Sequence, residues 1–247
     1  MTEPDLAPQP GRPLLLAATP SYLAVFKPAG MHVFGRGSLA GWLLDQRPQL
    51  AGVGPAAQPA LVHRLDRDTA GLMLAAASPG AYESLRRAFA EGAVDKRYLA
   101  LVSGELERPA LVDRPLGSRY RRSQRVSVAG GRQRLRGVRP AHTAIEPLGR
   151  SAGWTLCAVR IRTGVRHQIR AHLAHLGHPV AGDGLYGGAP LAGLEGRFFL
   201  HAWRLELAAG HAAGPLHHRC DLDAGLRQLA LDLGFAGALV DQRADKR

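Results

Sequence analysis

The sequence predicts an α+β fold, with a mixed, mostly antiparallel sheet and flanking helices. Strand-like and helix-like segments are interspersed without a regular βαβ alternation, and there is no internal repeat. The chain has 247 residues, 46% of them hydrophobic and 21% charged, which suits a globular protein with a substantial core. This length fits one large domain or two small ones.

Five segments have the short apolar pattern of strands, bounded by glycine, proline or serine. The stretch 96–106 also alternates in polarity, as expected for a strand with one exposed face. The predicted strands are "YLAVFKP" (22–28), "AGLMLAAAS" (70–78), "KRYLALVSGEL" (96–106), "WTLCAVRIRTG" (154–164) and "FFLHAWRLEL" (198–207).

Three segments have helical periodicity. "AYESLRRAFAEG" (81–92) places Tyr82, Leu85, Ala88 and Phe89 on one stripe and ends at a glycine. "VRHQIRAHLAHLGHPV" (165–180) ends at a glycine followed by a proline, and "LDAGLRQLALDLG" (222–234) is amphipathic. With five prolines, residues 1–20 are expected to form a tail, and 45–60 a loop. We expect a catalytic domain over 21–235 and a C-terminal tail over 236–247.

Charge is the most informative property of the composition. The formal net charge is +12, and only three of the 32 basic residues are lysines. Guanidinium groups pair bidentately with phosphates and stack on bases, so an arginine-rich surface favours a nucleic acid as partner. A GC-rich genome could explain arginine in place of lysine, but it would not explain the excess of positive charge.

The segment 119–139 concentrates this charge. It contains eight arginines, no acidic residue and the turn-forming "AGG". It could be a solvated loop, but so many unbalanced arginines favour a basic hairpin or arm that faces phosphates. The arginines are at 119, 121, 122, 125, 132, 134, 136 and 139.

No segment suggests a membrane or an export signal. The longest early apolar run, "LLLAA" at 14–18, is far below the roughly eighteen residues that a spanning helix needs. Cys157 and Cys220 are far apart and form no CxxC pair, which fits a reducing cytoplasm. We expect a cytoplasmic monomer.

Few catalytic motifs are available. The phosphate loop GxxxxGK[ST], the dinucleotide motif GxGxxG and the nucleophile motif GxSxG are all absent. Four histidines, at 167, 172, 175 and 178, lie within twelve residues, but no Cys, Asp or Glu stands among them. Histidines on a helix surface are therefore favoured over a metal site. A metal-dependent nuclease that uses them remains an alternative.

The stretch "LVHRLDRDTAGLML" (61–74) sets charged residues between apolar segments that look buried. Asp66 lies between arginines, which would keep its carboxylate ionised, and such a carboxylate can act as a nucleophile without a metal. The alternative is a structural ion pair in a corner of the fold. Asp68 fits a turn-capping role better.

Beyond pattern alone, "HRLDRDTAGL" closely resembles the signature of the RluA-type pseudouridine synthases. Further blocks of that family occur in the same order over roughly residues 21–207. They are the opening strand with its Lys-Pro-x-Gly turn, "VDKRYLALVSGEL", "RTGVRHQIRAHLAHLGHPVAGDGLYGG" and "FLHAWRLEL". The resemblance implies the pseudouridine synthase fold, with a central active-site cleft.

The resemblance also implies isomerisation of uridine to pseudouridine in large-subunit (23S) ribosomal RNA or tRNA, by base flipping and with no cofactor and no metal. It assigns the nucleophile to Asp66, proton handling and packing on the flipped base to Tyr98, and pairing with the aspartate to Arg170. Arg64 would enter the RNA helix where the base has left. RNA contacts are expected from the neighbouring residues His63, Arg67, Lys96, Arg166, His167 and Gln168, and from Arg121, Arg122 and Arg125 of the basic segment.

The chain departs from the family pattern at three points. Ala70 replaces a serine, Val165 replaces an arginine that here could be supplied by Arg166, and "MHVFGRG" lacks the usual proline. Many relatives carry an N-terminal S4 RNA-binding domain, and the blocks here begin too early for one, so we expect the catalytic domain itself to hold the RNA. A non-catalytic RNA-binding factor with the same fold is the rival interpretation.

Overall fold

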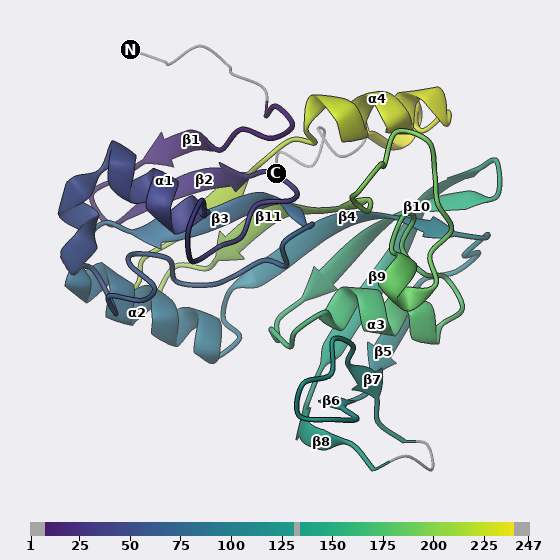
Figure 1. Cartoon of the computed structure of the whole chain (residues 1–247), viewed down its shortest axis with the longest axis horizontal. Helices are drawn as coiled ribbons and strands as arrows, with labels where there is room; N and C mark the ends of the chain where they lie inside the picture. The colour runs from purple at the N-terminus through teal and green to yellow at the C-terminus, as the bar shows by residue number, and fades with distance from the viewer. Residues whose placement is uncertain (1–7, 131–133, 240–247) are drawn as a thin grey trace. The chain divides into compact units, whose positions relative to one another are not determined.

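The computed structural model describes residues 8–130 and 134–239, which fall into two compact units (Figure 1). The first unit comprises the N-terminal part of the chain up to Lys96 together with residues 201–225. The second comprises residues 97–200 and the chain from Leu226 onward. The segment expected to form one catalytic domain is thus divided between two units.

The first unit is built on a mixed sheet. Its strands are β1 (Leu14–Ala18), β2 (Tyr22–Lys27), β3 (Ala70–Ala76), β11 (Leu200–Leu207) and β12 (Leu216–Arg219), in the order β1-β2-β3-β11-β12. All neighbours are antiparallel except the parallel pair β3 and β11. Every residue of β3 is buried, as its continuous apolar run predicts for a central strand.

Strand β1 lies where a tail was expected. Four of its five apolar residues pair with β2, and Leu16 falls at a register shift, so only the residues before this strand can belong to a tail. The surrounding prolines hide this strand in the sequence, because a single short run becomes a strand only through a partner. Residues 1–7 of the expected tail lie outside the described residues.

Two helices belong to the first unit. Helix α2 (Pro79–Ala90) buries Tyr82, Leu85 and Ala88, as its stripe predicts, and the Ser78 hydroxyl accepts a hydrogen bond from the Ala81 N–H at its start. Helix α1 (Leu39–Gln46) is capped in the same way by Ser38 and ends at the start of the segment 45–60 that we expected to be a loop. The 3₁₀ turn η1 (Pro48–Gly52) lies within that segment.

The second unit contains a larger sheet and a small basic sheet. The larger sheet has the order β4-β10-β9-β5, from β4 (Asp95–Ser103), β10 (Trp154–Ile161), β9 (His142–Ser151) and β5 (Ala110–Asp113). In this sheet β9 pairs antiparallel with both β10 and β5. The predicted alternation of β4 holds only at its start, because the strand is buried without interruption from Tyr98 to Val102. Among residues 8–130 and 134–239, no helix is both long and apolar enough to cross a bilayer.

The basic segment contributes to the small three-stranded sheet. Its order is β7-β6-β8, from β6 (Leu116–Ser118), β7 (Ser127–Val128) and β8 (Arg136–Arg139) (Figure 1). Buried side chains of Leu116 and Val126 join this sheet to helix α3 (Gln168–His175) and the 3₁₀ turn η2 (Gly184–Tyr186). Arg132 lies outside the described residues.

The C-terminal helix was expected from its amphipathic pattern. Helix α4 (Ala224–Asp232) buries Leu226 and Ala230. Residues 236–239, which we expected in a C-terminal tail, are helical, and residues 240–247 lie outside the described residues.

Gly71 marks a close approach of two strands in the first unit. Its φ is +119°, and a Cβ at this position would lie 2.2 Å from the backbone oxygen of Ala202 on β11. Only glycine combines this backbone conformation with this contact. The glycine that follows the Asp66 loop is therefore required by strand packing.

We predict that Gly71→Ala destabilises the protein by about 3 kcal/mol or more, because it adds both backbone strain and a backbone clash. Gly80→Ala is the matched control, since Gly80 lies in α2 with open space around it. That control should change stability by less than about 1 kcal/mol. Urea unfolding followed by circular dichroism measures both, and equal effects would contradict the packing role.

Candidate active site

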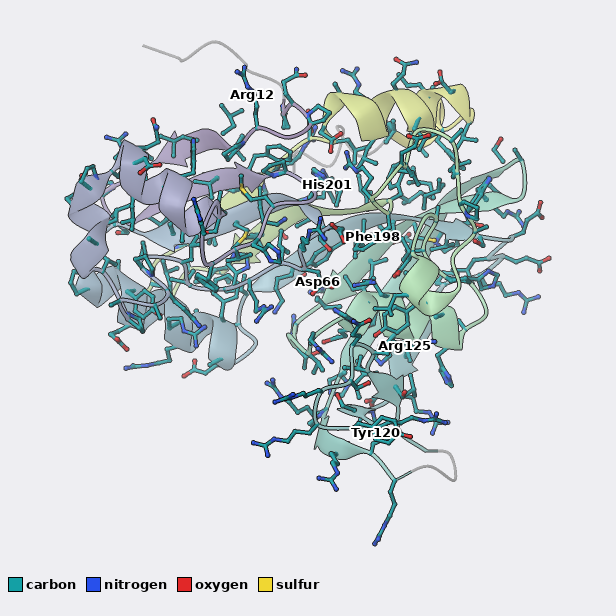
Figure 2. The ribbon with its side chains drawn as sticks, in the orientation of Figure 1. Arg12, Asp66, Tyr120, Arg125, Phe198 and His201 are labelled. Atoms are coloured by element: carbon teal, nitrogen blue, oxygen red, sulfur yellow. The ribbon has the colours of Figure 1, made fainter. Side chains whose placement is uncertain are left out.

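The loop 61–69 carries Asp66 in the first unit and leads into β3. Leu61 forms an isolated bridge with Ala75, and the Thr69 N–H donates to the Asp66 carbonyl, which closes a turn. Within this loop Arg64 and Arg67 are exposed and Asp66 is partly buried. Figure 2 labels Asp66 at this loop.

Lys27 holds this loop in place through a hydrogen bond to its backbone. Its side chain is fully buried at the end of β2, and its ammonium donates to the carbonyl oxygens of Pro28, Met31 and Arg67 at 2.8, 2.9 and 2.8 Å. A buried ammonium is costly unless it is hydrogen-bonded, so these carbonyls must stay in place around it. The backbone directly after Asp66 is thereby tied to the turn after β2. The Arg67 Nε reinforces the tie by donating to the Gly30 carbonyl at 3.2 Å.

His63 holds the other side of the loop. Its Nε2 accepts a hydrogen bond from the Leu74 N–H at 3.0 Å, and its ring stacks on Phe89 with the centroids 4.5 Å apart. Burial, with the positive charges of Lys96 and Arg86, lowers the pKa of His63 to about 3. The contacts of this neutral ring give His63 a packing role in the loop, and the RNA contact that we expected of it stays a prediction.

Lys96 lies beside the same aromatic ring. Its ammonium is 5.8 Å from the Phe89 centroid, and burial lowers the pKa of Lys96 to about 8, against a smaller opposing effect of Asp95. This lysine is 6% exposed, so its side chain also supports the interior of the first unit.

Arg170 and Asp183 form a buried ion pair in the second unit. The arginine Nε and Nη2 donate to the two carboxylate oxygens at 2.5 and 2.7 Å, in the bidentate geometry that guanidinium favours. The guanidinium also lies 4.4 Å from the Phe198 centroid and 5.0 Å from that of Tyr186. Asp183 is the acid that follows the histidine-rich helix, and no local pattern indicated its pairing with Arg170.

The segment before α3 is fixed by Gln168. Its amide oxygen accepts from the Thr163 hydroxyl and the Val165 N–H, and its amide nitrogen donates to the His142 carbonyl and the Thr143 hydroxyl. With both ends of its amide hydrogen-bonded and 3% exposure, Gln168 orders the backbone before α3. The RNA contact that we expected of it stays a prediction.

Val165, which stands where the family has an arginine, and the adjacent Arg166 make different contacts. Val165 packs against the apolar cluster beneath the small sheet, whereas the exposed Arg166 donates from Nη2 to the Ser123 carbonyl at 2.6 Å. Arg166 therefore reaches the basic segment. His167 adopts a left-handed backbone with φ of 55° at the start of α3, and its Nδ1 lies 3.1 Å from the Tyr186 hydroxyl.

The remaining predicted residues are divided between the two units. Tyr98 lies on β4 in the second unit with 7% of its surface exposed. Arg121, Arg122 and Arg125 are exposed on the basic segment, where Figure 2 labels Tyr120 and Arg125. The guanidinium of Arg125 lies 5.0 Å from the Tyr186 centroid. The central cleft implied by the family resemblance stays a prediction.

The clustered histidines serve separate contacts. The buried His172 bonds to the Thr143 hydroxyl and the Arg114 carbonyl, and His178 bonds to the Ser103 carbonyl. His175 is exposed. Within the part of the chain that the structure describes, no group of three or more His, Cys, Asp or Glu side chains could hold a metal ion.

The neutral His63 predicts a pH dependence of stability. The folded state does not protonate this ring until about pH 3, whereas in the unfolded chain its pKa is the ordinary histidine value of 6.5. The unfolded state therefore binds more protons between these values, and stability falls as the pH drops through this range, by at most about 1.4 kcal/mol per unit. His63→Gln keeps an acceptor but removes the titration. The advantage of wild type over this variant should shrink from about pH 7 to about pH 5 in urea unfolding, and a constant difference would contradict the burial of a neutral ring.

Asp183→Asn should cost about 3–5 kcal/mol of stability, because it removes the bidentate carboxylate partner of the buried Arg170 guanidinium. Asp221→Asn is the control, since Asp221 pairs with Arg219 at a largely exposed site where an ion pair is worth at most about 1 kcal/mol. Chemical denaturation compares the two. Similar losses in both variants would show that the Arg170–Asp183 pair is no more important than a surface pair.

Comparisons with known proteins agree with these motifs. Residues 21–175 match the RNA pseudouridylate synthase family. Over 202 residues the chain is 37% identical to ribosomal large subunit pseudouridine synthase D of Nitrosomonas europaea, which covers 77% of this chain and 56% of that protein. It is 39% identical to an uncharacterized RNA pseudouridine synthase of Chloroflexus aurantiacus (82% of this chain, 65% of that protein) and 34% identical to tRNA pseudouridine synthase C of Salmonella typhi (72% and 74%). The chain thus spans less than two thirds of the length of the first two of these relatives.

The fold agrees as well. Human RNA pseudouridylate synthase domain containing 1 superposes with a TM-score of 0.71 over 90% of this chain and 94% of that one, at 24% identity. A second human protein, RNA pseudouridylate synthase domain containing 4, gives the same TM-score at 23% identity, over 89% and 92% of the two chains. The expected α+β fold of this family is confirmed. From its motifs, its fold and these relatives, the chain belongs to the RNA pseudouridylate synthase family.

Proposed function

We propose that this protein isomerises uridine to pseudouridine in large-subunit ribosomal RNA or in tRNA. Membership of the RNA pseudouridylate synthase family supports the reaction, and relatives named for both kinds of RNA support these substrates. The net charge of +12 supports a polyanionic partner. The two buried free thiols, Cys157 and Cys220, suit the reducing cytoplasm in which we expect it to work.

The observation that carries the proposal is the construction of the Asp66 loop. Lys27 fixes the carbonyl of the residue after Asp66, and His63 fixes the strand side of the loop through Leu74 and Phe89. A nucleophile needs a fixed direction of attack, because a misplacement of about 1 Å can cost about a hundredfold in rate. This loop supplies that rigidity to a carboxylate that is only partly buried.

Base flipping assigns roles to the residues around that carboxylate. A uridine stacked in RNA must leave the helix before Asp66 can reach it, at a cost of a few kcal/mol. The exposed Arg64, two residues before Asp66, is proposed to fill the vacancy by stacking. Tyr98 is proposed as the platform for the extruded uracil, and Arg170 as the charge that pairs with the carboxylate.

The proposed reaction conserves all atoms of the uridine. The Asp66 carboxylate attacks the nucleoside, and the glycosidic bond from C1′ to N1 of the uracil breaks. The uracil turns within the site, and C5 forms the new bond to C1′ as the bond from the Asp66 carboxylate breaks and frees the aspartate. The proton on C5 is lost while N1 gains one. Tyr98 is proposed to handle the proton at C5. Because no atom and no electron is added or removed, the isomerisation requires no redox cofactor.

We predict that Asp66→Asn abolishes pseudouridine formation, at least about a thousandfold, while RNA binding stays within about threefold of wild type. Asp68→Asn, in the same loop, is the control for loss of an acid and should retain most activity. Mapping of pseudouridine in ribosomal RNA and tRNA from cells that carry each variant measures the effect.

The rival interpretation, a non-catalytic RNA-binding factor, makes the opposite prediction. In that case Asp66→Asn would leave the pseudouridine map and the cellular function unchanged. Loss of pseudouridine in both the Asp66 and the Asp68 variants would instead indicate a general disturbance of the loop, and purified-protein unfolding curves would identify it.

A further inference from the structure

A pocket in the second unit is lined by four arginines. It has a volume of about 390 Å³ and lies between β6, β8 and the segments 121–126 and 165–166. The arginines at its rim are Arg121, Arg122, Arg139 and Arg166. This volume lies within the range of about 300–1,000 Å³ that is typical of sites for small organic ligands. The Asp66 loop does not contribute to it.

Part of the pocket lining is apolar. Leu116 and Val126 are buried there, and Val165 is partly buried beside them as part of the cluster that joins the small sheet to α3. A site with an apolar part and several arginines fits a ligand that has an uncharged body and an anionic group. A nucleotide has both features, since the faces of its base are apolar and its phosphate is charged.

The arginine charges at the rim are not balanced by acids. Among the described residues, no ion pair joins Arg121, Arg122 or Arg139 to a carboxylate. Like charges gathered around one cavity repel each other, and an anion bound among them relieves that repulsion. Arg166 is already held by its hydrogen bond to the Ser123 carbonyl, so part of the rim is preorganised.

The lining of the pocket distinguishes Arg139 from Arg136. Both Gly137 and Arg139 of β8 line the cavity. Arg136, one residue before Gly137, is exposed on the same strand but does not line the cavity. The two arginines therefore offer a matched comparison of equal charge in one strand.

We propose that this pocket binds one nucleotide of the RNA other than the target uridine, with its phosphate held by Arg121, Arg122 and Arg139. The proposal rests on the proposed function for the identity of the RNA. Guanidinium pairs bidentately with phosphate. The proposed RNA substrate supplies phosphodiesters, so we take a phosphodiester as the occupant. The target uridine itself must meet Asp66, so the pocket serves affinity and register.

The test compares Arg139→Gln with Arg136→Gln. Binding of a short fluorescently labelled single-stranded RNA is measured by anisotropy over a range of salt concentrations, and pseudouridine formation is measured on ribosomal RNA and tRNA from cells that lack the protein. Arg139→Gln should weaken binding roughly tenfold and reduce the salt slope by about 1. It should raise KM and leave kcat unchanged, because the contact is made equally in the ground state and the transition state.

Two further variants sharpen the comparison. Arg136→Gln should change binding by less than about threefold, since it removes the same charge outside the pocket. Arg139→Lys keeps the charge but loses the planar guanidinium that can pair bidentately with a phosphate. The affinity of this variant for RNA should therefore fall between those of wild type and Arg139→Gln. Circular dichroism of each variant checks that the fold is retained.

The outcomes separate this proposal from the proposed function. Equal losses in the Arg139 and Arg136 variants would overturn the pocket, whatever the activity of the wild type. If the wild type forms no pseudouridine on any RNA but Arg139→Gln still binds the oligonucleotide more weakly than Arg136→Gln, the proposed function fails and the nucleotide pocket stands.

Discussion

The buried ammonium of Lys27 is the interaction on which the candidate active site depends. Lys27 is the last residue of β2 and follows the buried apolar residues of that strand. Its ammonium is surrounded by three carbonyl oxygens, two from the following turn and one from the Asp66 loop. Because a desolvated charge without these acceptors would be very costly, the turn and the loop cannot move apart without exposing it. This constraint explains how a run of charged residues can stand between two buried segments.

Sequence patterns predicted the strands and helices that are long enough to show a clear pattern of burial, either on one face or along the whole element. Strand β3 and helix α2 are examples, since an unbroken apolar run and a helical stripe each need only local information. Strand β1 and helix α1 escaped prediction because they are short and their stability comes from contacts outside them. β1 pairs with β2, and the Ser38 cap of α1 was not recognised as a start signal.

The candidate site was predicted by residue type and position, but not by hydrogen bonding. Gln168 and His63 stand within recognisable motifs, yet their partners are up to 26 residues away in the chain, which no local pattern shows. For the same reason the pairing of Arg170 with Asp183, 13 residues further along the chain, was not predicted. Nor was the hydrogen bond from Lys27 to the Arg67 carbonyl, 40 residues away. A motif identifies the residues of a candidate site. Which of their side chains make structural contacts depends on the tertiary fold and cannot be predicted from the motif.

Arginine has two distinct uses in this protein, and burial separates them. Arg170 is 6% exposed, and its charge is balanced by Asp183 and covered by two aromatic rings, so it contributes little to the outer field of the molecule. Arg136 and Arg139 of the small sheet are exposed and lack carboxylate partners among the described residues, so their field extends into solvent. The net charge of +12 is therefore not a uniform property of the surface. If the RNA is held mainly through the small sheet, affinity and chemistry depend on different residues, and the RNA preference can change without any change in the Asp66 loop.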